Sequence, residues 1–329
     1  MRSINSFNRT LFNRRGLSLL ALGLVALLFF PALALSAFTD SPRTSPATKR
    51  RQDPEDDDVV RVESDLVVLN VTVTDKSGKY VHKIPRADFK IFEDGHEQAI
   101  NVFSVEETPF AAAILLDTSS SMEGRISLAR AAAIRFLDGL RAEDVASVYH
   151  FNNEIEQLQD FSPGRDLPPM TYGLRSKGYT ALNDAIVRAS KDLALRPEKR
   201  RAIIVLSDGA DTRSAASADK ALAAAFAANA TIYTVDMIDP ATAAREKQIA
   251  GGALRNFANK SGGRYVPSAG GQSLSDAFQS IVEELSNQYT IGYKPTNRAR
   301  DGRWRSIELK LARAELNART RKGYRAPKS

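Results

Sequence analysis

The sequence predicts an α/β protein: a doubly wound, mostly parallel sheet, inserted in or flanked by a small β-sandwich module. Two observations predict the sheet, namely four short apolar runs and the amphipathic helical patterns that separate them. Strands buried on both faces of a parallel sheet have this continuously apolar character. A third observation, period-two alternation on both sides of that segment, predicts the flanking strands.

The α/β elements are expected within residues 108–288. The predicted strands are Ala111 to Leu116, Ala146 to Phe151, Ala202 to Leu206 and Thr231 to Val235. Apolar residues at three- and four-residue spacing predict helices at Ile126 to Leu140, Ala181 to Leu195, Ala215 to Asn229, Ala243 to Ser261 and Ser273 to Asn287. Open sheets of this kind place their ligand site beyond the carboxyl ends of the strands, which is where candidate residues are sought.

The β module is expected to come from residues 59–107 and 289–329. The first range supplies about four strands, which are too few to close a core by themselves. We therefore expect the C-terminal strands to pack on the N-terminal ones as one sandwich, the alternative being two separate half-sheets. Aromatic residues that alternate along these strands are expected in the core rather than on a binding surface: Tyr289, Tyr293, Trp304 and Tyr324.

The N-terminus has the pattern of an export signal, with four arginines and no acid in residues 1–37 and an apolar run from Leu17 to Phe30. Because apolar residues continue to Phe38, about long enough to cross a bilayer, an uncleaved inner-membrane anchor at residues 17–37 is the alternative. The segment would engage the membrane or the export machinery, and paired arginines alone do not indicate a twin-arginine route.

In either case the rest of the chain is expected outside the cytoplasm, in the periplasm or the extracellular space. Residues 38–58, nearly without apolar side chains, are expected to be a disordered linker. The net charge of +7 divides into +4 for residues 1–37, −6 for 38–293 and +9 for 294–329. The basic tail alternates with apolar residues as a strand does, so nucleic-acid binding is not expected.

Composition restricts the chemistry of any site. The absence of cysteine excludes disulfides, thiolate zinc sites and cysteine nucleophiles. The three histidines, His82, His96 and His150, show no metal-ligand spacing. Any metal ion is therefore expected to be held by oxygen.

Hydroxyl and carboxylate side chains follow the predicted strands. Asp117, Ser119 and Ser121 lie just past the first strand, Thr180 precedes a helix, and Asp208 follows the strand Ala202 to Leu206. Helix capping and turn formation are the simpler explanation of the first three. Together, however, the five residues suit Mg²⁺ or Mn²⁺, since Mg²⁺ takes six oxygens and usually keeps several waters. With so few carboxylates, the ion would stay electropositive enough to accept an acidic oxygen from a partner.

The segment from about Phe110 to Gln288 resembles a von Willebrand factor type A domain, and these five residues resemble that family's metal-ion-dependent adhesion site. The resemblance implies that Ser119 and Ser121 ligate the ion directly. It implies that Thr180, Asp117 and Asp208 act directly or through water. The flanks, including Asp88 to Gly95 and Gly323 to Pro327, resemble exported bacterial proteins related to this family, best known among acidobacteria.

The expected function is an exported adhesion or protein-interaction module that binds a protein or glycan carboxylate through this metal site. One alternative is a non-catalytic envelope scaffold with a purely structural metal. The other alternative is a Mg²⁺-dependent phosphotransfer enzyme. Dehalogenase-type phosphotransferases need a second acid two residues after the aspartate nucleophile, and this chain has Ser119 at that position, which argues against the alternative. The sequence also lacks G-x-S-x-G and the nucleotide-binding glycine motifs, so catalysis is not expected. Three nearby acids, Glu123, Asp184 and Asp211, are expected to be solvated or to cap turns and helices.

Overall fold

The computed structural model describes residues 66–105, 108–164, 167, 169–239, 241–242, 244–267 and 271–328. The expected export signal (1–37) and linker (38–58) lie outside these ranges. No helix within them has the length and apolar character needed to span a membrane.

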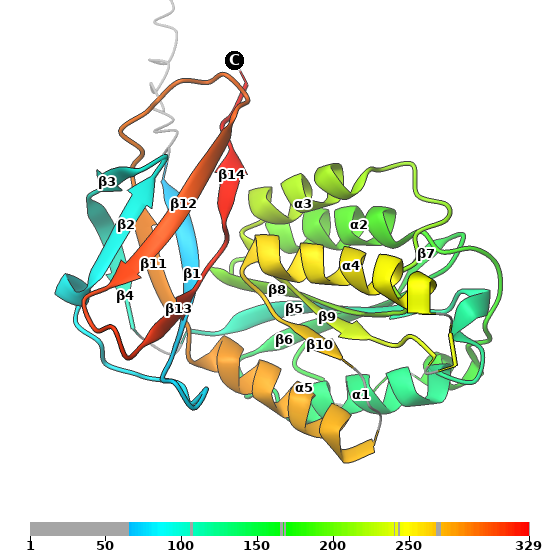
Figure 1. The fold of residues 1–329 in the computed structure, drawn as a ribbon. Helices are drawn as coiled ribbons and strands as arrows, with labels where there is room; N and C mark the ends of the chain where they lie inside the picture. The colour runs from blue at the N-terminus through cyan, green and yellow to red at the C-terminus, as the bar shows by residue number, and fades with distance from the viewer. Residues whose placement is uncertain are drawn as a thin grey trace, which may run out of the picture. The chain divides into compact units, whose positions relative to one another are not determined.

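The α/β segment is built on a mixed sheet (Figure 1). Within the described ranges its six strands have the order β10-β9-β8-β5-β6-β7, and all neighbours are parallel except β6 and β7. The strands are β5 (Phe110–Asp117), β6 (Val145–Phe151), β7 (Ile155–Ser162), β8 (Arg200–Ser207), β9 (Ala230–Asp236) and β10 (Tyr265–Pro267). All eight residues of β5 are buried, as its central place in the sheet and its apolar sequence require.

Helices cover both faces of this sheet (Figure 1). On one face α1 and α5 pack against alternate residues of the strands, and on the other face α2, α3 and α4 pack against the residues between them. The helices are α1 (Ile126–Asp138), α2 (Leu182–Ala194), α3 (Ala218–Ala227), α4 (Ala244–Ser261) and α5 (Gly271–Ser286), with short 3-10 turns η1 (Arg86–Asp88), η2 (Ser120–Met122) and η3 (Pro169–Gly173).

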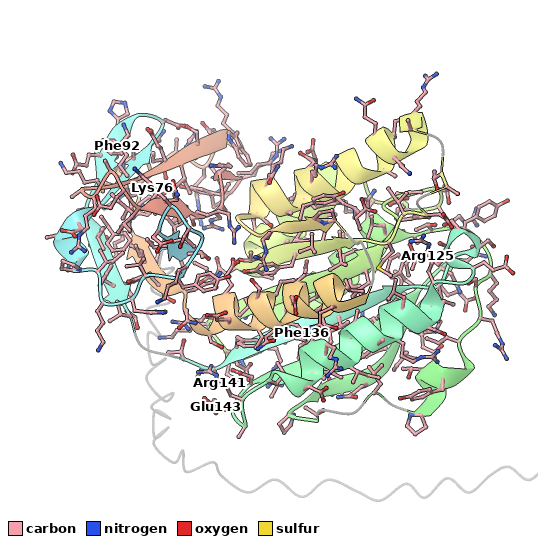
Figure 2. The ribbon with its side chains drawn as sticks, turned by 60° about the horizontal axis from the view of Figure 1, so that its bottom comes forward. Lys76, Phe92, Arg125, Phe136, Arg141 and Glu143 are labelled. Atoms are coloured by element: carbon pink, nitrogen blue, oxygen red, sulfur yellow. The ribbon has the colours of Figure 1, made fainter. Side chains whose placement is uncertain are left out.

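Two side chains of the α1 region show how the first face is fixed (Figure 2). Phe136 contacts Phe110 and Phe278, with ring centroids 6.4 and 6.5 Å away, and so joins α1 to β5 and α5. Arg125, just before α1, donates to the carbonyls of Met237 (2.5 Å) and Ile238 (2.8 Å). The start of α1 is thereby tied to the segment that follows β9.

The flanks form a sandwich of two four-stranded antiparallel sheets, as far as the structure describes them, with orders β13-β1-β11-β4 and β14-β12-β2-β3. Each sheet takes two strands from before the α/β segment and two from after it. The strands are β1 (Val67–Thr74), β2 (Phe89–Glu93), β3 (His96–Gln98), β4 (Ile100–Ser104), β11 (Tyr289–Tyr293), β12 (Trp304–Leu311), β13 (Asn317–Arg319) and β14 (Gly323–Arg325). One apolar core joins the two sheets. The predicted fold class is confirmed.

Some details differ from the sequence-based expectation. The six-stranded sheet also contains two strands that the sequence did not predict. The strand β7 is rich in polar residues, and β10 has only three residues. Of the four flanking aromatics, Tyr289 and Tyr293 are buried and Tyr324 is half-buried, whereas Trp304 is 41% exposed. The expectation that Trp304 lies in the core was wrong, because it stands at the start of β12 and packs instead beside Phe226 of α3.

Candidate metal centre

The carboxylate of Asp117 is fixed at the end of the central strand β5. The residue is 1% exposed. Its Oδ1 accepts the backbone N–H of Ser119 (2.9 Å), and its Oδ2 accepts the hydroxyl of Ser207, at the end of β8 (2.5 Å). Because β5 and β8 are parallel neighbours, these residues meet at the carboxyl edge of the sheet.

The next two candidate residues lie on the turn that follows β5. The hydroxyl oxygens of Ser119 and Ser121 are 3.1 Å apart, since Ser119 is the N-cap of the 3-10 turn η2 that contains Ser121. Backbone bonds hold this turn to the loop before α2: Ser120 N–H donates to the Gly178 carbonyl (3.1 Å), and Lys177 N–H donates to the Thr118 carbonyl (3.0 Å).

Thr180 lies on that second loop and is 3% exposed. Its N–H donates to the hydroxyl of Thr212 (3.0 Å), and its carbonyl accepts the N–H groups of Thr212 and Arg213. Thr180 lines a shallow hollow of about 570 Å³ together with Ser119 and Ser121. Three hydroxyl side chains predicted as ligands thus open onto one space.

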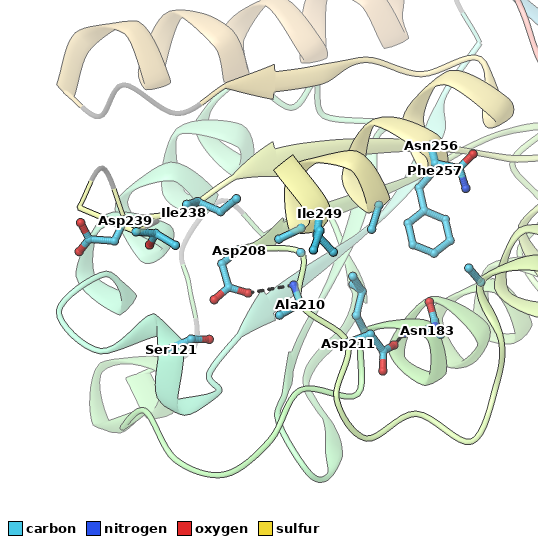
Figure 3. A pocket seen from close by; sticks show the side chains of 16 residues that line it. Ser121, Asn183, Asp208, Ala210, Asp211, Ile238, Asp239, Ile249, Asn256 and Phe257 are labelled. Carbon is cyan, nitrogen blue, oxygen red and sulfur yellow. Dashed lines mark hydrogen bonds between the residues drawn. The ribbon is translucent and has the colours of Figure 1, made fainter. Parts of the chain in front are cut away.

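Asp208 follows β8 at the rim of an adjoining cavity of about 640 Å³, which Ser121 also lines (Figure 3). Its Oδ1 accepts the N–H of Ala210 (3.1 Å). The structure therefore brings four of the predicted residues to two adjoining hollows that share Ser121, with Asp117 directly behind them.

The electrostatics of this edge favour a cation. Burial raises the pKa of Asp117 to about 7, hydrogen bonds from Ser119 and Ser207 oppose that rise, and the charge of Asp208 adds to it. Neither carboxylate has an ion pair with a described lysine or arginine. An all-oxygen set with two unpaired carboxylates fits Mg²⁺ or Mn²⁺.

The candidate metal site is identified mainly by its three hydroxyl side chains and not by a cluster of acidic residues or histidines. Within the described residues, no group of three or more histidine, cysteine, aspartate or glutamate side chains is placed to hold a metal ion. The sequence also gave no reason to assign a role to Ser207. Its contact with Asp117 joins residues 90 positions apart, and only the pairing of β5 with β8 reveals it.

The neighbouring acids have structural roles. The Asp184 carboxylate accepts the N–H groups of Ala215 (2.8 Å) and Ala216 (2.9 Å). Asp211 accepts N–H groups from Asn183 (2.8 Å) and Ser214 (3.1 Å). Both acids brace the loops around the hollows, Asp211 also lines the larger cavity, and Glu123 is exposed.

His150 has polar partners that the sequence did not reveal. Its Nε2 lies 3.0 Å from a Glu156 carboxylate oxygen, and its Nδ1 lies 3.2 Å from the Thr118 hydroxyl. Thr118 is 1% exposed and donates its hydroxyl to the Phe151 carbonyl (3.1 Å), so it is not placed to attack a substrate.

Residues 112–210 match the family model for the von Willebrand factor type A domain, a range that includes all five candidate ligands. The chain therefore carries a von Willebrand factor type A domain, with the β sandwich as an additional module. No curated protein matches the sequence closely enough to count as a relative.

Several solved structures are similar at low sequence identity. The PilB minor pilin from Streptococcus sanguinis is 14% identical, with a TM-score of 0.44 over 56% of this chain and 63% of that chain. The von Willebrand factor type A protein from Catenulispora acidiphila is 14% identical, with a TM-score of 0.45 over 74% of each chain. BatB from Bacteroides thetaiotaomicron is 20% identical, with a TM-score of 0.42 over 54% of this chain and 98% of that chain. This chain spans less than two thirds of the pilin.

Proposed function

We propose that the domain is a metal-dependent binding module, which takes a carboxylate of a protein or glycan ligand as an additional ligand of Mg²⁺ or Mn²⁺. The observation that carries the proposal is the convergence of Ser119, Ser121 and Thr180 on one open hollow beside two unpaired carboxylates. The domain would act outside the cytoplasm, a location that rests on the N-terminal sequence pattern.

Each residue has a distinct part in this function. Ser119, Ser121 and Thr180 would present neutral oxygens to the ion, and Asp117 and Asp208 would balance part of its charge. The bound ion would supply a positive centre for an incoming carboxylate. Ser207, by donating to Asp117, fixes the orientation of that carboxylate, as outer hydrogen bonds do at other metal sites.

Calorimetric titration of Mg²⁺ and Mn²⁺ into the full chain, purified in detergent, tests the site. Asp117→Ala and the double variant Ser119→Ala/Ser121→Ala should abolish binding while circular dichroism stays unchanged. Ser120→Ala is the matched control, because Ser120 lines the same hollow and makes no described side-chain hydrogen bond but is not one of the predicted ligands. The absence of binding to the parent protein at millimolar ion would contradict the proposal.

A second titration tests the carboxylate preference. An acidic peptide should bind the metal-loaded protein, and EDTA should abolish that binding. A metal that raises the melting temperature but supports no carboxylate binding would favour the structural-metal alternative.

A further inference from the structure

A second cavity, of about 540 Å³, lies between α3 and the C-terminal part of the β module. Four arginines line it, Arg298, Arg300, Arg321 and Arg325, and none of the described lining residues is acidic. It contacts the end of α3 at Phe226 and Ala227, whereas the cavity beside the metal centre contacts α3 at Ala218. The nearest lining residues of the two cavities on that helix, Ala218 and Ala223, are about 7.5 Å apart along its axis at 1.5 Å per residue.

Arg321 is the buried member of this group, with 9% of its surface exposed. Its guanidinium lies between the rings of Phe226 and Tyr324, at 6.0 and 5.8 Å from their centroids. Nη1 makes one long bond to the Phe226 carbonyl (3.4 Å), and Nε has no hydrogen-bond partner in the described part of the chain. A buried cation with unmet hydrogen-bonding capacity at a cavity wall is costly unless an anion joins it.

No described carboxylate forms an ion pair with Arg321. Burial lowers its pKa to about 10, and the groups that oppose this shift are the phenols of Tyr293 and Tyr324. Those two hydroxyls donate to the buried carboxylate of Glu93, at 2.6 and 3.0 Å. Glu93 is thus engaged by the tyrosines, and the guanidinium of Arg321 stays charged at neutral pH.

Arg298 and Arg325 add exposed positive charge at the mouth of the cavity, and neither has a described ion pair or side-chain hydrogen bond. Other arginines of the same segment are paired: Arg303 and Arg305 lie 3.8 and 3.0 Å from the Asp301 carboxylate. Arg298, Arg321 and Arg325 therefore differ from Arg303 and Arg305 in having no described acidic partner.

The remaining wall is apolar. Ala223, Phe226 and Ala227 of α3 line one side, and Leu66 and Val67 at the start of β1 contribute as well. A ligand that uses the whole cavity therefore has an anionic group and an apolar body. Several guanidiniums around one volume match a phosphate, which has three terminal oxygens and nearly two charges, better than a single carboxylate.

We propose that this cavity binds an organic phosphate, with the phosphate held by Arg298, Arg321 and Arg325 and an apolar body against Phe226. The phosphate can belong to a soluble ester or to a lipid headgroup, since both offer the same oxygens. The site is independent of the metal centre, so failure of either proposal leaves the other standing.

Calorimetric titration of phenyl phosphate into the full chain, with EDTA present, tests this site. The double variant Arg298→Ala/Arg325→Ala should weaken binding at least about tenfold. The matched control Lys294→Ala/Arg303→Ala removes the same charge from exposed positions outside the cavity and should bind like the parent. Arg321→Gln should also lose binding, and the surface double variant keeps the test decisive if Arg321→Gln does not fold.

Related compounds measure separately how much the phosphate group and the apolar ring of phenyl phosphate contribute to binding. Inorganic phosphate and phenol should each bind more weakly than phenyl phosphate, and benzoate should bind more weakly than the phosphate with the same ring. Displacement of phenyl phosphate by dihexanoyl phosphatidic acid but not by glycerol phosphate would support a lipid source, and the reverse would support a soluble ester. No binding at about 10 mM phenyl phosphate, equal loss in the control variant, or benzoate binding as tightly would overturn the proposal.

Discussion

The carboxylate of Glu284, near the end of α5, is ion-paired with the guanidinium of Arg319 in β13. Glu284 is 1% exposed, and the same carboxylate oxygen accepts hydroxyls from Tyr233 of β9 (2.8 Å) and Thr72 of β1 (3.0 Å). This buried group therefore joins the von Willebrand factor type A domain to the β sandwich.

Removing the acid from this group should be strongly destabilising. Glu284→Gln leaves Arg319 without its ion pair. Because the Arg319 side chain is 34% exposed, we expect a loss of about 2–3 kcal/mol of unfolding free energy, below the ~3–5 kcal/mol of a fully buried pair. Urea denaturation measures the loss, and Glu284→Gln/Arg319→Met should recover part of it. The more exposed pair of Asp88 and Arg313 is the comparison, for which Asp88→Asn should cost under about 1 kcal/mol. Equal losses at both sites would contradict the prediction.

The stability of the metal-free protein should depend on pH through Asp117. Its pKa is about 7 in the folded protein, against an ordinary value of 3.8, so the folded state holds the proton more tightly. Stability contributed by this group is present below about pH 4 and is lost as pH rises toward 7. In EDTA, Asp117→Asn should therefore be more stable than the parent at pH 8, by ~4 kcal/mol, and about equal to it at pH 4.

Urea denaturation of both proteins at the two pH values measures this difference. Saturating Mg²⁺ should stabilise the parent at pH 8 and not the variant. A stability difference that is the same at pH 4 and pH 8 would show that ionisation of Asp117 is not its cause.

The loop that carries Asp208 depends on glycine at position 209. Gly209 has φ +83°, and a Cβ there would lie 2.4 Å from the Ala250 carbonyl oxygen and 2.8 Å from Leu254 Cγ. Gly209→Ala should therefore displace the loop, lower stability by more than about 1 kcal/mol and weaken Mg²⁺ binding. Thermal unfolding and metal titration measure the two effects.

Gly124 provides the matched control for that substitution. It has φ +77°, but no described atom lies within 4 Å of where its Cβ would be. Gly124→Ala introduces backbone strain without a clash, at about 1 kcal/mol. Similar results for the two variants would show that the contact with α4 is unimportant.

Ser207 should affect metal affinity without touching the ion. Ser207→Ala removes the hydroxyl that donates to Asp117, and the loss of such an outer hydrogen bond weakens metal binding about tenfold or more. Ser190→Ala is the control, because this buried hydroxyl bonds only within α2, to the Ile186 carbonyl (2.6 Å). Titration of Mg²⁺ should separate the two variants, and equal affinities would exclude a positioning role.

The sequence was sufficient to predict the α/β fold where apolar strands and amphipathic helices alternate. It did not reveal β7, because an edge strand with one exposed side contains polar residues such as Gln157 and Gln159. It misplaced Trp304, because alternation along a strand does not say which end of the strand leaves the core. These errors concern the margins of sheets, where burial is incomplete.

For the candidate site, strand order was enough to bring Asp117, Thr180 and Asp208 to one edge. Contacts between side chains could not be predicted in the same way. The bond from Ser207 to Asp117 and the position of Arg321 against Phe226 both join residues about 90 positions apart. Ser207 directly precedes the predicted ligand Asp208, but sequence proximity does not reveal its contact with Asp117.

The pairing of β1 with β11 determines how the protein would carry a mechanical load. The strands are antiparallel, with Val67 opposite Tyr293 and Val71 opposite Tyr289. The α/β segment connects to β11 at Tyr289, so tension between Val67 and that segment pulls the two strands along their length in opposite directions. The hydrogen bonds between the two strands are then loaded together in shear, whereas a peeling force would break them one after another. A force applied to a ligand bound at the metal centre would therefore load the β1–β11 pair of the sandwich in shear, the direction in which paired strands resist force most.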